Sequence, residues 1–259
     1  MAITLRSQRE IELMQQAGVV VAKVLSKLKE NVRPHVSTAE LNDIALEMTK
    51  QAGAEPLFKG VRNPAAKIPF PGAICSSINE QIVHGIPSGK VKLQEGDIIS
   101  IDFGIRLNGY CGDSAITVNV GEVSPLKRKL MEVTSRVLEI AIEESAPGVK
   151  WSFVAAQMQS YAEQCGFSVV REYVGHGIGK QMHEDPKVPN FVNNELLRND
   201  ILLTEGMVLA VEPMVNAGVA ETKTLKDGWT VVTRDGSPSA HFEHTIAIDK
   251  NGCRVLTKL

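Results

Sequence analysis

Two aspartates, Asp102 and Asp113, are the first candidate functional residues in this sequence. Residues 98–107 alternate apolar and polar side chains, which predicts a β-strand, and Asn108-Gly109 after them is a strong hairpin signal. A two-residue loop there places Asp102 opposite Ala115 and therefore diagonal to Asp113 on one face of the hairpin. Diagonal neighbours of this kind lie about 7–8 Å apart at the backbone.

Two carboxylates that converge in this way repel each other, and without a partner one of them takes up a proton. A bound cation removes the repulsion, and oxygen ligands suit Mn, Fe, Co or Zn. Hydrolytic sites with two metal ions hold them about 3.5–4 Å apart, a span that such a pair can bridge. The alternative is a pair of solvated acids on an exposed sheet face, which the apolar character of this strand disfavours.

Three further residues could complete a metal site. Glu212 lies in the apolar segment VLAVEPM, and Glu243 lies in HFEHTIAI. An acid in an apolar strand is costly unless it is ionised against something positive, although a salt bridge on a half-exposed strand is the alternative. His176 lies between glycines, which indicates a close backbone approach, although a lone histidine is more often an ordinary surface or core residue.

Composition narrows the class of protein. The 259 residues carry a net charge of −2, and 43% of them are apolar, which is typical of a globular protein and not of a general nucleic-acid binder. No apolar run approaches the roughly 18 residues of a membrane helix, and the charged N-terminus predicts no secretory signal. The four cysteines form no CxxC pair, so we expect reduced thiols in a cytoplasmic protein.

Local signals in the sequence predict the helices and strands that carry these residues. Capping boxes begin at Ser7 and Ser37, and Pro125 follows Ser124 as the first residue of a third helix. Expected helices span residues 7–30, 37–53, 124–146 and 152–165. Expected strands span residues 74–83, 98–107, 111–120, 169–174, 207–214 and 240–249, with a hairpin region over 222–233, a loop over 183–194 and a short C-terminal strand.

Two segments recur along the chain. The stretch Leu93–Asp102 matches Leu203–Glu212, which lies 110 positions later. Four residues recur 113 positions later without a gap: Pro34, Val36, Leu41 and Gly53 match Pro147, Val149, Val154 and Gly166. This order predicts an internal duplication with halves at roughly 7–120 and 124–249, in which Glu212 is the counterpart of Asp102. The alternative is that a common turn-into-strand pattern occurs twice.

These residues together resemble the methionine aminopeptidases, over nearly the whole chain. The matching motifs are Cys75-Ser-Ser-Ile-Asn-Glu with Val83-His84-Gly-Ile-Pro87, Ile101-Asp102-Phe, Gly112-Asp113, Gly175-His176-Gly-Ile-Gly179, Val211-Glu212-Pro-Met214 and Phe242-Glu243-His-Thr245. The chain is similar to the short bacterial type I form. The resemblance implies a single catalytic domain over 1–259 with the α+β pita-bread fold, internally duplicated with pseudo-twofold symmetry.

The resemblance implies a site with two divalent ions, of Co, Mn, Fe or Zn. Asp102 would bind one ion, and Asp113 and Glu243 would bridge the two. His176 and Glu212 would complete the shell of the other ion, and Glu212 could also shuttle a proton. A hydroxide between the ions would attack the first peptide bond, since bound metals lower the pKa of water towards neutrality.

The resemblance also assigns residues to the substrate. His84 would contact the scissile amide, and His183 the carbonyl oxygen. The side chain of the N-terminal methionine would lie among Phe70, Cys75, Met182 and Trp229. Members of the family often carry an aromatic residue at the position of Met182 and near Lys67, so the chain departs from the family there.

The implied partners are N-terminal methionyl peptides and nascent chains, with the ribosome as a possible partner, for a monomer that contacts neither membranes nor specific nucleic-acid sequences. The implied selectivity is for methionine followed by a small residue. Two alternatives remain open. The first is a proline-directed peptidase of the same fold, which shares the five ligands. The second is a non-enzymatic binding homologue, although such relatives lose ligands that this chain keeps.

Overall fold

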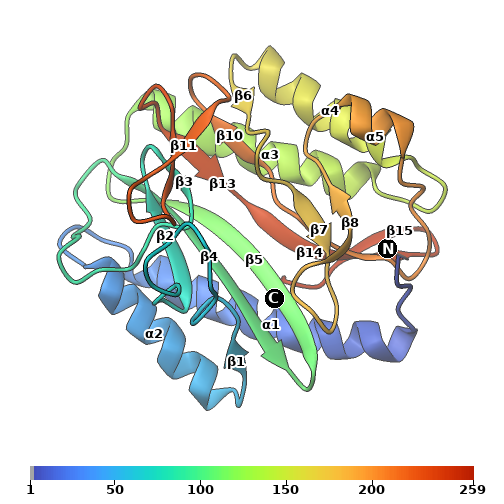
Figure 1. Cartoon of the computed structure of the whole chain (residues 1–259), viewed down its shortest axis with the longest axis horizontal. Helices are drawn as coiled ribbons and strands as arrows, with labels where there is room; N and C mark the ends of the chain where they lie inside the picture. The colour runs from blue at the N-terminus through green and yellow to red at the C-terminus, as the bar shows by residue number, and fades with distance from the viewer. Residues whose placement is uncertain (1–2) are drawn as a thin grey trace.

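The computed structural model of the chain describes residues 3–259, in which five helices and fifteen strands follow one another (Figure 1). The helices are α1 (Gln8–Asn31), α2 (Thr38–Gln51), α3 (Pro125–Glu144), α4 (Trp151–Gln164) and α5 (Asn194–Arg198). The strands are β1 (Glu55–Pro56), β2 (Ile74–Ile78), β3 (Gln81–Val83), β4 (Ile98–Leu107), β5 (Tyr110–Asn119), β6 (Ser168–Val169), β7 (Gly175–Gly177), β8 (Glu184–Val188), β9 (Val208–Val211), β10 (Met214–Asn216), β11 (Thr222–Thr224), β12 (Val231–Thr233), β13 (Ser239–His241), β14 (Glu243–Asp249) and β15 (Gly252–Val255).

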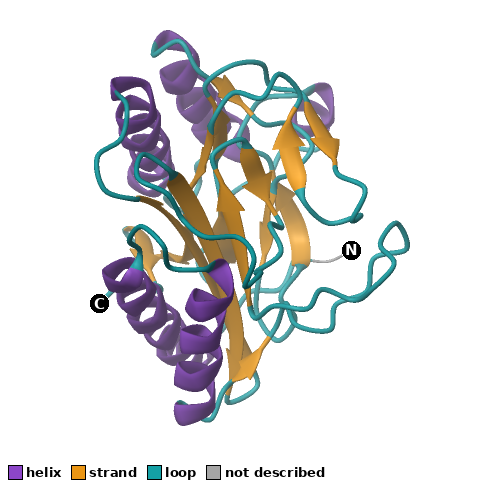
Figure 2. Cartoon of the chain, turned by 90° about the vertical axis from the view of Figure 1, so that its left-hand side faces the viewer, coloured by secondary structure: helices purple, strands orange, loops and turns teal. Residues whose placement is uncertain are grey.

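A nine-stranded antiparallel sheet lies at the centre of the described chain. Its strands follow the order β1-β4-β5-β14-β9-β7-β8, with β2 also paired to β4 and β15 to β14. Helices α1 to α4 lie on one side of the curled sheet, and loops with short strands lie on the other (Figure 2). The sheet therefore has one face that packs against helices and one face that is left for a site.

The β4–β5 hairpin has the predicted register. Asp102 pairs with Ala115, and Gly104 pairs with Asp113. The loop is Asn108-Gly109, whose φ angles of 51° and 81° are both positive, as a type I′ turn requires. The two aspartates are thus diagonal neighbours on one face. An added Cβ at Gly104 would lie 3.0 Å from an Asp113 carboxylate oxygen, so glycine leaves the space that this carboxylate occupies.

The apolar face of this hairpin packs against the N-terminal helices. Ile99, Ile101, Phe103 and Ile105 are fully buried, in one cluster with Val21 and Leu25 of α1 and Leu41 of α2. A second cluster joins α3 and α4 to the strands of the second half, with Trp151, Val154 and Met158 fully buried. Successive side chains of a strand point to opposite faces of the sheet. Burial of the isoleucines against the helices therefore directs Asp102 to the other face.

The predicted helices are confirmed, with ends within a few residues. Ser7 and Ser37 each close a capping box, with Glu10 and Glu40 respectively. Pro125 is the first residue of α3, and its cap is the Ser124 side chain. The hairpin region over 222–233 is confirmed as β11 paired with β12, and the C-terminal strand as β15.

Three predicted strands are wrong in extent, because the chain passes from one sheet to another inside them. The segment 74–83 divides at Asn79, whose φ is 52°, and β3 leaves the large sheet to pair with β12. The segment 207–214 divides at Pro213, which has no N–H to donate to a ladder. The segment 240–249 divides at Phe242, since β13 pairs with β10 while β14 pairs with β5 and β9.

The region between residues 168 and 198 differs most from the sequence-based prediction. The strand predicted over 169–174 is reduced to β6, which ends at Val169 and pairs with β10. The loop predicted over 183–194 contains β8, which pairs with β7, and α5 begins at Asn194. The pairing of β7 with β8 is irregular, because the register shifts between His176 and Gly177.

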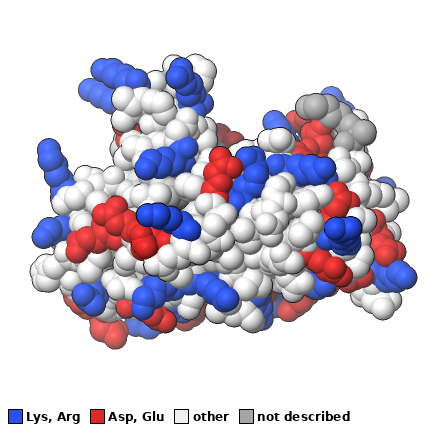
Figure 3. Space-filling view, turned by 90° about the horizontal axis from the view of Figure 1, so that it is seen from below, with Lys and Arg blue, Asp and Glu red and all other residues white. Residues whose placement is uncertain are grey.

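Within residues 3–259, none of the helices combines the length and the apolar character needed to cross a membrane. The face drawn in Figure 3 carries basic and acidic side chains interspersed, without a continuous patch of either sign. This distribution agrees with the net charge of −2.

Candidate metal centre

Five neighbouring strands bring the predicted metal ligands together. Asp102 lies on β4, Asp113 on β5, Glu243 on β14, His176 on β7, and Glu212 directly after β9. These strands follow one another in the sheet as β4-β5-β14-β9-β7. Residues more than a hundred positions apart in sequence therefore meet on one face of the sheet.

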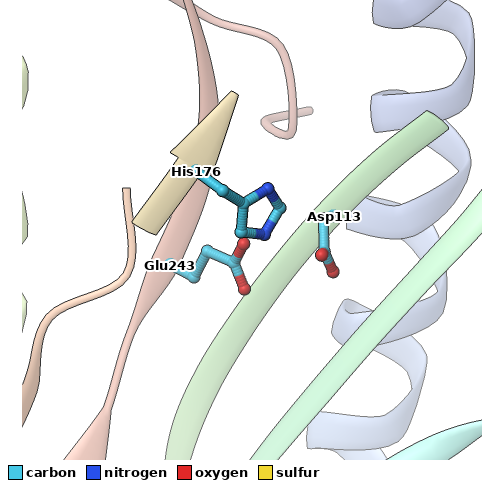
Figure 4. A group of neighbouring side chains, drawn as sticks. All are labelled: Asp113, His176 and Glu243. Carbon is cyan, nitrogen blue, oxygen red and sulfur yellow. The ribbon is translucent and has the colours of Figure 1, made fainter. Parts of the chain in front are cut away.

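Three of the five residues meet most closely. Asp113, His176 and Glu243 each offer a ligand atom, and these atoms all lie within 4.8 Å of one another (Figure 4). The Nε2 atom of His176 is 3.6 Å from a carboxylate oxygen of Glu212. Asp102 lines the same cavity as these four residues. The His176 Nδ1 atom lies 2.9 Å from the Gly177 carbonyl oxygen, a hydrogen bond that directs Nε2 towards the acids.

Several carboxylate oxygens in this cluster have no hydrogen-bond partner within the described chain. They are Oδ1 of Asp102, Oδ1 of Asp113 and Oε1 of Glu243, and all three are buried. A buried acceptor without a partner costs about 1–3 kcal/mol, and more when it is charged. Oxygen and imidazole donors that converge in this way fit a divalent transition-metal ion.

Burial and mutual repulsion raise the pKa of these carboxyls. Burial, then the neighbouring charge of Asp113, raises the pKa of Asp102 well above its usual value. Burial followed by the other acids has the same effect on the pKa values of Glu212 and Glu243. For Asp113, burial raises the pKa to about 7. A cation bound among the four carboxyls would stabilise the charged form of each of them.

The pKa values of the histidines in the cavity are shifted in the opposite direction, downwards. Burial lowers the pKa of His176 to about 4, with a smaller contribution from His183. Burial also lowers the pKa of His84 to about 4 and, by itself, that of His183. These imidazoles are therefore neutral at pH 7, so that His176 can offer a lone pair to a metal ion and the other two can exchange hydrogen bonds with a substrate.

The predicted substrate residues line the same cavity of about 130 Å³. The rings of Phe70 and Trp229 meet edge to face, with centroids 5.2 Å apart, and Cys75 and Met182 pack with them. The indole nitrogen of Trp229 donates to the Ile68 carbonyl at 2.9 Å, which fixes the ring. The wall beside the acids is thus apolar and contains two sulfur atoms.

His84 and His183 lie on two sides of this cavity. His84 has a φ of 59°, and its ring meets Tyr173 and Trp229 edge on, with centroids 5.6 and 6.4 Å away. The ring of His183 is 4.3 Å from that of His176. The structure therefore brings all the predicted site residues to one cavity.

Sequence reasoning missed three residues of this region. His241 is 1% exposed, its Nε2 is 3.9 Å from Glu212, and neither ring nitrogen has a hydrogen-bond partner within residues 3–259. Its alternation with Glu243 in the sequence could have identified it. Phe58 and Val61 also line the cavity, but they come from a loop whose course no local pattern reveals.

The glycines beside His176 make close approaches to the protein itself. A Cβ at Gly175 would overlap the Ala210 carbonyl, and one at Gly177 would overlap the Asp185 carbonyl. A Cβ at Gly179 would overlap the guanidinium of Arg6. The glycine spacing therefore lets strand β7 and the following turn fit between neighbouring strands and the N-terminal segment.

Comparison with known proteins agrees with this site. Residues 12–250 match metallopeptidase family M24. A methionine aminopeptidase of Aquifex aeolicus is 47% identical over 259 residues, which is 100% of both chains. The crystal structure of a methionine aminopeptidase from Thermotoga maritima superposes with a TM-score of 0.94, at 40% identity and full coverage of both chains.

The chain belongs to metallopeptidase family M24, and it is therefore a metal-dependent hydrolase. Within that family it groups with the methionine aminopeptidases, as the sequence motifs predict. A Xaa-Pro dipeptidase of Bacillus anthracis shares the fold, with a TM-score of 0.76 at 21% identity, and the chain covers only 62% of it. The prediction of an α+β pita-bread fold is confirmed.

Proposed function

We propose that the protein removes the N-terminal methionine from peptides and nascent chains, preferring a small second residue, by hydrolysis at a centre of two metal ions. The observation that carries the proposal is the cluster of Asp113, His176 and Glu243 within 4.8 Å, beside an apolar cavity of about 130 Å³. The preference for a small second residue is inferred from the resemblance to methionine aminopeptidases.

The residues that would hold the ions are Asp102, Asp113, His176, Glu212 and Glu243. Three orphaned carboxylate oxygens and a neutral imidazole support this ligand set, which suits Co, Mn, Fe or Zn. When bound, such ions act as Lewis acids and lower the pKa of water towards neutrality.

Glu212 is the residue best suited to move a proton. Its pKa is raised, chiefly by burial, and its carboxylate oxygens lie 3.6 Å from His176 and 3.9 Å from His241. A carboxyl with a raised pKa can accept a proton from the attacking water and later donate it to the leaving amine.

His84 and His183 would hold the substrate amide. Both rings line the cavity with the acids, and burial lowers both pKa values, so each ring carries one N–H donor and one acceptor nitrogen at neutral pH. A donor aimed at the carbonyl oxygen stabilises the charge that develops there during attack.

The apolar wall would recognise methionine. Phe70, Cys75, Met182 and Trp229 surround a small space, and an unbranched thioether side chain packs well against aromatic and sulfur atoms. Apolar pockets discriminate between similar shapes by only about 1–3 kcal/mol. We therefore expect norleucine to be accepted and an N-terminal tryptophan to be excluded.

The remaining partners follow from this activity. We infer that the protein acts as a monomer in the cytoplasm, where nascent chains emerge from the ribosome. All four cysteines are unpaired in the structure, which agrees with a reducing compartment.

Release of methionine from short peptides tests the proposal. The metal-free protein is reconstituted separately with Co, Mn, Fe or Zn and assayed on Met-Ala-Ser, Met-Arg-Ser, Trp-Ala-Ser and a Xaa-Pro peptide. We expect rapid cleavage of Met-Ala-Ser alone. Equal cleavage of Met-Arg-Ser or Trp-Ala-Ser would contradict the pocket assignment, and preferential cleavage of the Xaa-Pro peptide would favour the proline-directed alternative.

A further inference from the structure

The N-terminal segment reaches the candidate site through Arg6, a residue outside every motif that the sequence analysis identified. Only 6% of the Arg6 side chain is exposed. Arg6 also lines the wide mouth of the site, together with His84, His176 and His183. A buried arginine beside a catalytic cavity needs an explanation, because arginine is rarely buried without a partner.

We propose that Arg6 is a positioning residue, which holds the turn 180–184 through Glu184 and thereby places Met182 and His183 against the substrate. The inference deepens the proposed function, on which it rests. The guanidinium of Arg6 forms an ion pair with Oε2 of Glu184, the residue that follows His183.

Arg6 is held at both ends. Its backbone N–H donates to the Gly206 carbonyl at 2.7 Å, at the start of the segment that leads to Glu212. One guanidinium nitrogen also lies 3.8 Å from a carboxylate oxygen of Glu10, in the first turn of α1. The N-terminal segment that leads into α1 (Figure 1) is therefore fixed to Gly206 and to α1. From this fixed segment the Arg6 side chain extends to the turn 180–184.

Glu184 passes this constraint to the turn. Its second oxygen, Oε1, accepts the backbone N–H of Gln181 at 3.0 Å. The carboxylate therefore bridges Arg6 and the beginning of the turn, and the closed ring from Gln181 to Glu184 contains Met182 and His183. Substrate contact at those two residues depends on the shape of this ring.

Gly179 gives an independent indication of the same contact. A Cβ there would overlap the Arg6 guanidinium, and the overlap is with that side chain rather than with backbone. The carbonyl of Gly179 accepts the Cys111 N–H at 2.8 Å, and its N–H donates to the Gln181 carbonyl at 3.0 Å. The guanidinium therefore lies directly beside the backbone at the start of the turn.

The turn needs such support because strand pairing does not supply it. In the β7–β8 ladder, Gly177 pairs with Glu184 after a register shift, so the residues between them have no partners in that ladder. A misplacement of about 1 Å in a positioning group can cost about a hundredfold in rate. We expect loss of the Arg6 contact to lower kcat/KM by roughly 10- to 100-fold.

The test compares variants of the full-length metal-loaded protein. Arg6→Met and Glu184→Gln remove the ion pair, Arg6→Lys keeps the charge, and Arg136→Met is the control, because Arg136 pairs with Glu143 on the outer surface of α3. We expect Arg6→Met to lower kcat on Met-Ala-Ser and to change the ratio of kcat/KM for methionine and norleucine peptides, since Met182 moves with His183. Arg6→Lys should recover part of the loss, and Arg136→Met should show none.

A second set of variants keeps the test decisive if Arg6→Met is poorly folded. Gly179→Ala should displace the guanidinium and reproduce the kinetic loss. In the Arg6→Met background the same substitution should add little, because the obstructing group is gone. Each protein is also measured for metal content and melting temperature.

Three results would overturn the inference. These are an Arg6→Met protein with kcat/KM within twofold of the parent, Gly179→Ala losses that add fully to those of Arg6→Met, or kinetic losses that only follow losses of metal and thermal stability. Failure of the proposed function would look different, because the parent protein itself would then release no methionine.

Discussion

Two regions of the chain, residues 7–120 and 124–249, contain similar helices and turns but place different residues in the candidate site. Helices α2 and α4 begin and end 113 positions apart, at Thr38–Gln51 and Trp151–Gln164. The backbone N–H of His35 donates to the Leu93 carbonyl at 2.8 Å, and that of Gly148 donates to the Leu203 carbonyl at 2.8 Å.

The turns before the acid-bearing strands are also alike. Gly96 and Gly206 have φ angles of 87° and 90°, conformations that favour glycine. Their N–H groups donate to the carbonyls of Val120 and Ile248 at 2.9 and 3.0 Å. We propose that the halves are related by one rotation, as the sequence repeat predicts.

The halves differ where the chemistry is proposed. The first half presents Asp102 and Asp113 from a hairpin of two continuous ten-residue strands. In the second half the corresponding strand stops at Val211, and Glu212 lies in the break before Met214. We call residues 7–120 the regular half and residues 124–249 the irregular half. The regular half contributes Asp102 and Asp113 from continuous strands, and the irregular half contributes Glu212, His176 and the turn that carries His183.

The largest expected effect comes from the regular half. Asp113→Asn keeps the side-chain shape but removes the charge, and we expect loss of bound metal and, with it, of measurable hydrolysis. Removing a residue that only hydrogen-bonds a metal ligand already lowers metal affinity or activity by roughly 10–100-fold. The measurement is metal analysis beside peptide hydrolysis. Asp249→Asn, the same change at the exposed end of β14, is the control. Normal metal content in Asp113→Asn would remove this residue from the proposed ligand set.

The next effect tests the irregular half and the edge of the cavity. His84→Ala and His183→Ala should retain metal but lose about a hundred- to a thousandfold in kcat, the usual cost of an oxyanion-type donor. His35→Ala is the control, because the exposed His35 has a φ of 74°, close to the 59° of His84. The two substitutions therefore carry a similar free-energy cost of placing alanine at a positive φ. Near-normal kcat in both variants would make the two histidines structural.

The hairpin could be predicted from sequence because its signals are local. Alternation, the Asn108-Gly109 loop and the resulting register of Asp102 each depend on residues within one short segment. The breaks at Asn79, Pro213 and Phe242 were missed in the strand predictions, because they depend on which distant strand becomes the partner.

The structure brings the predicted site residues to one cavity, whereas several of the strands around it were predicted with wrong bounds. The four acids and His176 could be proposed as ligands because the residues that flank them form specific motifs. Phe58 was missed because only the packing of separate segments brings its loop to the cavity. His241 lies beside Glu212, and its alternation with Glu243 was the local signal that could have identified it. The role inferred for Arg6 depends on a contact with Glu184, and no sequence pattern relates two residues so far apart.

A smaller effect concerns pH and metal affinity. Burial raises the pKa of Asp113 to about 7, whereas the pKa of His176 is lowered to about 4. A metal ion binds the deprotonated carboxylate, so affinity should fall as pH drops below 7, and binding near pH 6 should release protons. The lowered pKa of His176 means that this ring stays available down to about pH 4. Calorimetry in buffers of different ionisation enthalpy measures the protons released. Binding without proton release at pH 6 would contradict the electrostatics described for the acids.

The smallest effect tests the shared framework, through stability. Leu41 on α2 and its counterpart Val154 on α4 are both fully buried. Leu41→Ala should lower the free energy of unfolding by about 2–5 kcal/mol. Val154→Ala, which removes two methyl groups, should cost about 2 kcal/mol. Urea unfolding of the metal-free protein measures both. A negligible effect at one position only would show that the two helices do not play equivalent parts.

We propose that residues from the regular half and the irregular half form one metal centre that carries the activity. Titration of the metal-free protein with Co or Mn, monitored by bound metal per chain and by methionine release from Met-Ala-Ser, tests it most directly. We expect two ions per chain in the parent, with activity appearing as they bind. We expect Asp113→Asn from one half and His176→Ala from the other to lose both the ions and the activity. Methionine release without bound metal, or metal bound equally well in both variants, would contradict it.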